Sequence, residues 1–195
     1  MAQTITKLKV RDFDLTNTSW EDLRVPVTAG TKGGASDPGF TVFITDGAAS
    51  TGVFAYGFDT TTEEELFFTV QIPHNYKLGT DIEAHTHWGV KASSGLTGTV
   101  RWGLEYTIAN VGDAFGTTST IYTTATAAGT QFLHHYNDFT TADISGSAID
   151  DLSTMLLCRV FRDVANDDFA NDAYLFEIDF HYEIDGFGSD IETAK

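Results

Sequence analysis

Two histidines separated by a single residue stand in the middle of the chain. In an extended strand successive side chains point to opposite faces, so His85 and His87 project from the same face. Glu83 and Lys91 share that face, whereas Trp88 belongs to the opposite, apolar one. Imidazoles beside a carboxylate can bind a transition metal, recognise a ligand or form hydrogen bonds across a polar interface. The pattern of residues allows all three.

Residues 173–185 also alternate between polar and apolar side chains with a period of two, and their polar side offers further metal ligands. That side carries histidine and carboxylates, among them Glu177 and Asp179, and the other side carries Tyr174, Phe176, Ile178, Phe180, Tyr182 and Ile184. If this segment lies beside the histidine strand, a metal site becomes feasible. The candidate metal ligands are then His85, His87 and His181. The competing interpretation is cross-strand hydrogen bonding between histidine and carboxylate without any cofactor, and we favour it.

The spacing around the histidines resembles part of the first motif of the cupin jelly rolls. In that motif two histidines and a later glutamate bind a metal inside the barrel. Gly79, His85, His87 and Gly98 fit it, but Lys91 stands where the glutamate should be, and the second cupin motif is not visible. The resemblance covers roughly a tenth of the chain. It implies an alternative function, a jelly roll that binds a metal or a small molecule.

The sequence lacks the motifs of other common enzyme mechanisms. There is no Gly-x-Ser-x-Gly elbow and no phosphate-binding loop. The single cysteine, Cys158, lies in the apolar run 155–161, which predicts a core residue rather than a nucleophile. The segment 163–172 is rich in Asp and Asn but lacks the glycine and terminal glutamate of a calcium loop, so we interpret it as a solvated loop. We predict that the protein is not an enzyme.

Composition narrows the classes of partner. The 195 residues carry a formal net charge of -17, which disfavours binding to nucleic acid or to an anionic membrane. One cysteine excludes an intramolecular disulfide. No apolar run is long enough to span a bilayer and no signal-peptide layout is present, so we expect a soluble protein made in the cytoplasm.

Short apolar or alternating segments separated by Gly- and Asp-rich turns predict many strands and no long helix. The predicted strands are 20–27, 40–44, 53–58, 66–72, 81–91, 99–108, 121–123, 131–136, 155–162 and 173–185. A short glycine-containing loop joins 81–91 to 99–108, so we expect these two strands to form an antiparallel hairpin. Trp88 and Trp102 would then be buried on the same face. At most one helical turn is expected, between Ala142 and Ser153.

These elements predict an all-β protein, an antiparallel β-sandwich of the jelly-roll type. Residues 20–195 form one sandwich domain in this interpretation. Residues 1–19 form an N-terminal arm that pairs with a neighbouring chain, because the alternating Leu8 and Val10 have too few apolar neighbours to fold by themselves.

The sequence resembles a family of tailed-bacteriophage virion proteins of similar length. The landmarks that carry the resemblance lie in the same order along most of the chain: Trp20–Val27, Val70–His74, His85–Trp88, Trp102–Tyr106 with Ile108–Asn110, and Phe176–Asp185. The segment between Val111 and Ser153 contains no such landmark. The resemblance implies a structural role and no enzymatic activity.

We therefore expect a virion structural protein that decorates or stabilises the capsid. Its expected partners are itself, as a homo-oligomer such as a trimer, and the major capsid protein, and its expected location is the virion surface. The first alternative is a tail or head-fibre accessory protein that binds carbohydrate through exposed aromatic side chains. The second is the cupin-like metal- or small-molecule-binding jelly roll.

Overall fold

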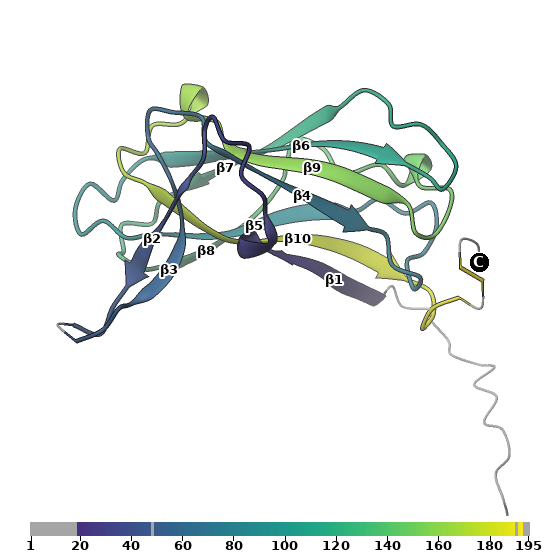
Figure 1. The fold of residues 1–195 in the computed structure, drawn as a ribbon, viewed down its shortest axis with the longest axis horizontal. Coiled ribbons are helices and arrows are strands. Elements are labelled where there is room, and N and C mark those ends of the chain that lie inside the picture. Colours follow the sequence, from purple (N-terminus) through teal and green to yellow (C-terminus); the bar gives the residue numbers. More distant parts are fainter. Residues whose placement is uncertain (1–18, 48, 190, 193–195) are drawn as a thin grey trace, which may run out of the picture.

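Two antiparallel β-sheets pack face to face in the computed structural model, which describes residues 19–47, 49–189 and 191–192 (Figure 1). This confirms the predicted all-β sandwich. The predicted arm, residues 1–19, lies outside the described residues except for Ser19, so its pairing with a neighbour stays a prediction. The expected helical turn is present as the 3-10 helix Gly146–Ala148, and two further short ones span Val27–Ala29 and Val164–Asn166.

The two sheets divide the ten described strands unevenly. Sheet A has the order β2-β3-β10-β5-β8, and β1 pairs with the part of β10 that lies beyond β3. Its strands are β1 (Ser19–Pro26), β2 (Gly39–Ile44), β3 (Val53–Phe58), β5 (Glu83–Val90), β8 (His134–Asp138) and β10 (Ala173–Ile184). Sheet B has the order β4-β9-β6-β7. Its strands are β4 (Glu65–Gln71), β6 (Thr99–Ala109), β7 (Ser119–Thr126) and β9 (Met155–Arg162).

The pairing of the strands is nested. The first of eight consecutive strands pairs with the last, β3 with β10, and the pairs β4 with β9, β5 with β8 and β6 with β7 follow inward. Two further pairings, β5 with β10 and β6 with β9, join these pairs into the two sheets. The longest strand, β10, therefore lies at the centre of sheet A and has neighbours on both edges (Figure 1).

The predicted hairpin between 81–91 and 99–108 is wrong. The first segment forms β5 in sheet A and the second forms β6 in sheet B, so the connecting loop crosses from one sheet to the other. Trp88 and Trp102 are nevertheless fully buried, as predicted, because the apolar faces of the two strands meet across the sandwich. Their rings make an edge contact with centroids 6.4 Å apart. The alternation predicted the buried face correctly but not the partner strand.

A β-bulge corrects the predicted face of β10. The register shifts between Leu175 and Glu177, which leaves Phe176 as the extra residue. Before the bulge, Leu175 packs in the core while Tyr174 stacks against Phe43 outside it. After the bulge the core residues are the even-numbered ones, beginning with Ile178. Tyr174 and Phe176 therefore lie on the outer face, on the same side as Glu177 and the residues that alternate with it.

Candidate functional site

The outer face of sheet A gathers polar side chains from four neighbouring strands. The register places His85 of β5 directly between Asp179 of β10 and Asp138 of β8. The next row along β5 contains His87, between Glu177 and Tyr136. We call this surface the histidine face and define it as Asp22, His85, His87, His134, Tyr136, Asp138, Glu177, Asp179 and His181. It forms because residues opposite one another in antiparallel strands share a face.

His85 is the most unusual member of this face, because its side chain is buried although it points away from the core. It is 3% exposed, covered by the rings of Tyr136 and His181 at centroid distances of 5.0 and 5.5 Å. Neither ring nitrogen has a hydrogen-bond partner among the residues that the structure describes. Burial lowers the pKa of His85, although the nearby Asp138 carboxylate acts in the opposite direction.

A chain of hydrogen bonds runs beside His85. The Nε2 atom of His87 lies 3.0 Å from Oδ2 of Asp179, and its Nδ1 atom lies 2.8 Å from Nε2 of His134. Asp179 is 5% exposed, and its other oxygen, Oδ1, lacks a partner within the described part of the chain. Burial raises the pKa of Asp179 to about 6, with a further contribution from the adjacent Glu177 carboxyl.

His181 belongs to a separate pair at the β1 edge of the face. Its Nδ1 atom lies 2.5 Å from Oδ1 of Asp22, and its ring stacks on Trp20 with centroids 4.8 Å apart. Arg24, the next outward residue of β1, donates from Nε and Nη2 to the two carboxylate oxygens of Glu177. The pair between His181 and Asp22 is half exposed, unlike His85.

The three histidines predicted as metal ligands thus share one face, and β10 does lie beside β5. The structure divides them between two groups of candidate donors, each with donor atoms within 4.8 Å of one another. The members are His85, His87 and Asp179 in one group, and Asp22, His85 and His181 in the other. Sequence patterning alone did not connect Asp22, His134 or Asp138 with this face. The signal for the last two was the alternation of β8, which places them on the same side as Tyr136.

The cupin-like interpretation requires the histidines to point into the space between the sheets. That side of β5 carries Ala84, Trp88 and Val90, all part of the hydrophobic core. The histidines lie on the opposite side, so a metal site inside the sandwich is wrong for these residues. Cys158 is a core residue as predicted, and burial raises the pKa of its thiol to about 12, which makes it a poor nucleophile.

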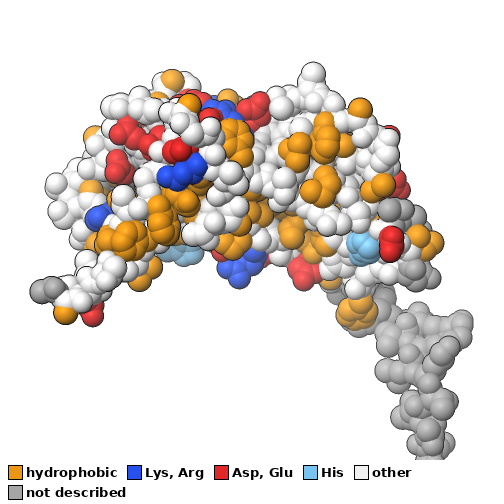
Figure 2. All heavy atoms as spheres, viewed as in Figure 1, with side chains coloured by type: hydrophobic (Ala, Val, Ile, Leu, Met, Phe, Trp, Pro, Cys, Tyr) orange, Lys and Arg blue, Asp and Glu red, His pale blue; other side chains and the backbone are white. Residues whose placement is uncertain are grey.

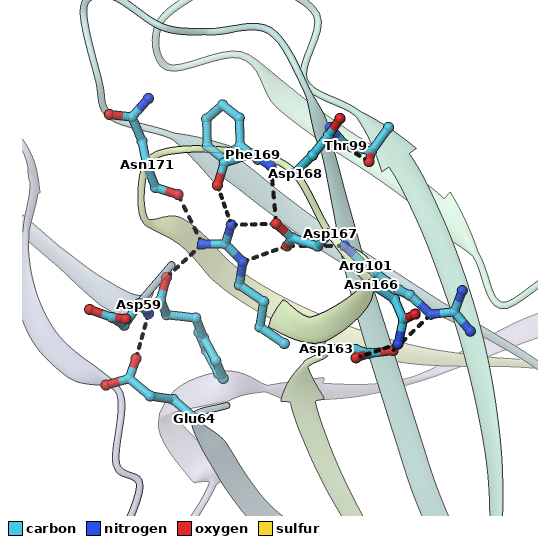
Figure 3. A network of polar contacts seen from close by, with 12 residues as sticks. Asp59, Glu64, Thr99, Arg101, Asp163, Asn166, Asp167, Asp168, Phe169 and Asn171 are labelled. Carbon is cyan, nitrogen blue, oxygen red and sulfur yellow. Dashed lines mark hydrogen bonds and ion pairs between the residues drawn. The ribbon is translucent and has the colours of Figure 1, made fainter. Parts of the chain in front are cut away.

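The segment after β9, residues 163–172, is a loop with several exposed residues, as its composition suggested, but it also has a structural role. It wraps around Arg162, whose side chain is fully buried. Asp167 accepts hydrogen bonds from Nε and Nη2 at 2.6 and 2.9 Å, and two of the three remaining donated bonds go to the carbonyls of Phe169 and Asn171 (Figure 3). The carbonyl of Phe58 accepts one more, at 3.0 Å. Sequence reasoning missed this network, which we call the Arg162 network.

Comparison with known proteins finds no matching family model and no similar curated protein. Among the described residues, no helix has the length and hydropathy needed to cross a bilayer.

Proposed function

We propose that this protein is a structural component of a tailed-phage virion, which decorates or stabilises the capsid by binding to other copies of itself and to the major capsid protein. The family landmarks in the sequence support this role. They fall on β1, on the end of β4, and on β5, β6 and β10, which are strands of both sheets and supply much of the shared core. The resemblance therefore concerns residues that determine the fold.

The strand order also supports the proposal. One sheet contains β3, β10, β5 and β8, and it packs over the other, which contains β4, β9, β6 and β7. This arrangement results when four nested antiparallel pairs of strands wrap into a sandwich. Eight strands in this order fit a jelly roll, an architecture common in viral coats and also found in lectins and cupins. Because one fold hosts many functions, the order is compatible with a virion role without requiring it.

The observation that carries the proposal is a hairpin that projects from the sandwich and whose two strands carry no charged residue. Strands β2 and β3 extend away from the body of the molecule at the lower left of Figure 1, and Figure 2 shows hydrophobic side chains gathered at the base of this hairpin. Neither strand contains Asp, Glu, Lys or Arg. Its exposed apolar residues are Phe40, Ile44, Val53 and Phe54, which are 39–67% exposed.

Two apolar strands without charged residues, on a protein with a net charge of -17, suit association between copies. Like-charged surfaces repel one another, whereas contact through these strands buries apolar area without charged side chains of the strands facing each other. Phe40 and Phe54 pack on each other with ring centroids 5.6 Å apart, so they present one continuous aromatic surface. Aromatic residues of this kind are the usual anchors of protein interfaces.

A census of purified virions by mass spectrometry, with copy number, tests the role directly. Hundreds of copies per particle are expected for capsid decoration, on the order of the copy number of the capsid protein it would cover. A handful of copies would place the protein in the tail or a head fibre, and its absence from the virion would overturn the proposal.

The hairpin itself is tested with the double variant Phe40→Ser/Phe54→Ser in sedimentation and virion-binding assays. Loss of the oligomer and of capsid occupancy is expected, with the circular dichroism of the sandwich retained. Val111→Ser is the matched control, because Val111 is also an exposed apolar residue but lies in the turn after β6. If the double variant associates as the control does, the hairpin is not the interface.

A further inference from the structure

The histidine face contains two buried polar groups that lack partners and lie directly opposite each other. Both ring nitrogens of His85 and the Oδ1 atom of Asp179 are unpartnered among the described residues, and both side chains are more than nine-tenths buried. Leaving a buried donor or acceptor unpaired is costly, so native proteins rarely keep such groups without a reason. Here three such atoms come together in one place. This arrangement indicates a ligand that these atoms bind.

The types of donor atom identify the class of ligand. Two imidazoles and a carboxylate, from His85, His87 and Asp179, are the donor set that proteins use for zinc and related first-row metals, whereas calcium and magnesium prefer oxygen alone. The donor atoms lie within 4.8 Å of one another. Tetrahedral zinc requires donor separations of about 3.4 Å given its usual bond lengths, so small side-chain rotations are sufficient.

His134 supplies the outer contact that a metal-binding histidine usually has. It lies 2.8 Å from Nδ1 of His87, while Nε2 of His87 is directed at Asp179. A proton held on Nδ1 of His87 and donated to His134 leaves Nε2 free to bind a metal, and such contacts fix the orientation of the ligand ring. A solvent-open hollow lined by His87, His134 and Asp179, among other residues, provides a route of entry.

In the alternative group, the two donors other than His85 already pair with each other. His181 and Asp22 form a direct contact of 2.5 Å, and Trp20 stacks on the histidine ring. Asp22 is also largely exposed, so solvent can hydrate its remaining oxygen. The unpartnered atoms of His85 and Asp179 have no such compensation. The first group is therefore the stronger metal site.

We propose that His85, His87 and Asp179 bind one divalent transition-metal ion of the zinc class on the outer face of sheet A, with His134 positioning His87. This site uses none of the exposed hairpin residues proposed for assembly, so the two proposals can fail separately. The overall negative charge of the protein favours a cation there. An open coordination position toward the hollow would be filled by water or by a group of a partner.

The test uses the full, untagged chain, stripped with a chelator and then titrated with Zn²⁺ by calorimetry, with bound metal measured after dialysis. Saturable binding of one zinc per chain is expected, and Co²⁺ should give the visible absorption of a protein-bound ion. His87→Gln and Asp179→Asn should each weaken binding more than ~100-fold, because losing an outer partner alone costs ~10–100-fold. His134→Gln should show that smaller loss.

The matched control is His181→Gln, which removes a neighbouring histidine that belongs to the other group. It should weaken zinc binding far less than His87→Gln does, because His181 covers His85 without binding the metal. Loss of binding in His181→Gln but not in His87→Gln would overturn the proposed ligand set, and absence of saturable binding to the parent protein would overturn the site. Circular dichroism and the fluorescence of the buried tryptophans establish that each variant is folded. His87→Gln, at a partly exposed position, should disturb folding less than Asp179→Asn at a buried one.

Discussion

The Arg162 network and the histidine face both bury ionisable groups, but only the first is complete. Arg162 has five N–H donors, and every one of its nitrogens has an acceptor in a carboxylate or a backbone carbonyl (Figure 3). His85 and Asp179 are buried to nearly the same extent, yet between them they leave three polar atoms without partners in the described part of the chain.

This difference separates structural polar groups from groups that bind a ligand. A buried charge with all of its partners fixes the geometry around it, here by fastening the loop after β9 to the end of β3 through the carbonyl of Phe58. A buried polar group with missing partners contributes little to folding and becomes favourable only when something binds to it. The two regions should therefore respond in opposite ways to the removal of their central residue.

The largest expected effect is at Arg162. The substitution Arg162→Leu leaves Asp167 buried without its counter-charge and three backbone carbonyls without a donor, so the free energy of unfolding should fall by about 3–5 kcal/mol. Urea denaturation followed by tryptophan fluorescence measures it. Lys77→Met is the control, because its pair with Glu183 is partly exposed and should contribute at most about 1 kcal/mol. Equal losses in the two variants would contradict the structural role of the network.

A much smaller effect is expected at His85 when metal is absent. In the presence of a chelator, His85→Leu should change the free energy of unfolding by no more than about 1 kcal/mol, because no hydrogen bond is lost and an apolar side chain avoids the cost of burying unpaired nitrogens. With zinc added, the parent protein should gain stability while the variant does not. A large loss in chelator would show that His85 has a structural partner after all, and would remove the contrast with Arg162.

The sequence predicted the strands and their buried faces far better than the neighbours of each strand. The segments 53–58 and 155–162 match β3 and β9 residue for residue, because alternation is a local property. The partner of 81–91 depended on whether the following loop turns back within a sheet or crosses the roughly 10 Å to the other one. A short glycine-containing loop can do either, so local sequence could not decide.

The candidate site was predicted only in part, because strand pairing again could not be decided from local sequence. Alternation placed His85, His87 and Asp179 on one face, but the burial of His85 depends on strands at both sides and on the covering rings of Tyr136 and His181, which are distant in sequence. The Arg162 network was within reach of sequence reasoning. Arg162 shares its parity with the buried residues Leu156, Cys158 and Val160, and an arginine on a core face requires an acidic neighbour.

The smallest expected effect concerns His135, a second buried histidine, which lies on the inner side of sheet A. Its ring stacks on Trp88 with centroids 4.2 Å apart, and burial, followed by the nearby His134, lowers its pKa. The unfolded chain therefore binds a proton more readily than the folded one, so the free energy of unfolding should fall as the pH drops below the unfolded-state value of about 6.5.

His135→Phe keeps an aromatic ring against Trp88 but cannot take up the proton. In chelator, the loss of stability between about pH 7.5 and pH 5.5 should be smaller in this variant than in the parent protein. Urea midpoints at both pH values measure the difference, and an NMR titration of the His135 ring should give a pKa below 6.5. The same acid sensitivity in both proteins would mean that His135 is protonated as easily in the folded state as in the unfolded one. Burial beside Trp88 would then not be costly for the charged ring, and the contrast between buried groups with and without partners would not extend to His135, whose Nε2 also lacks a partner among the described residues.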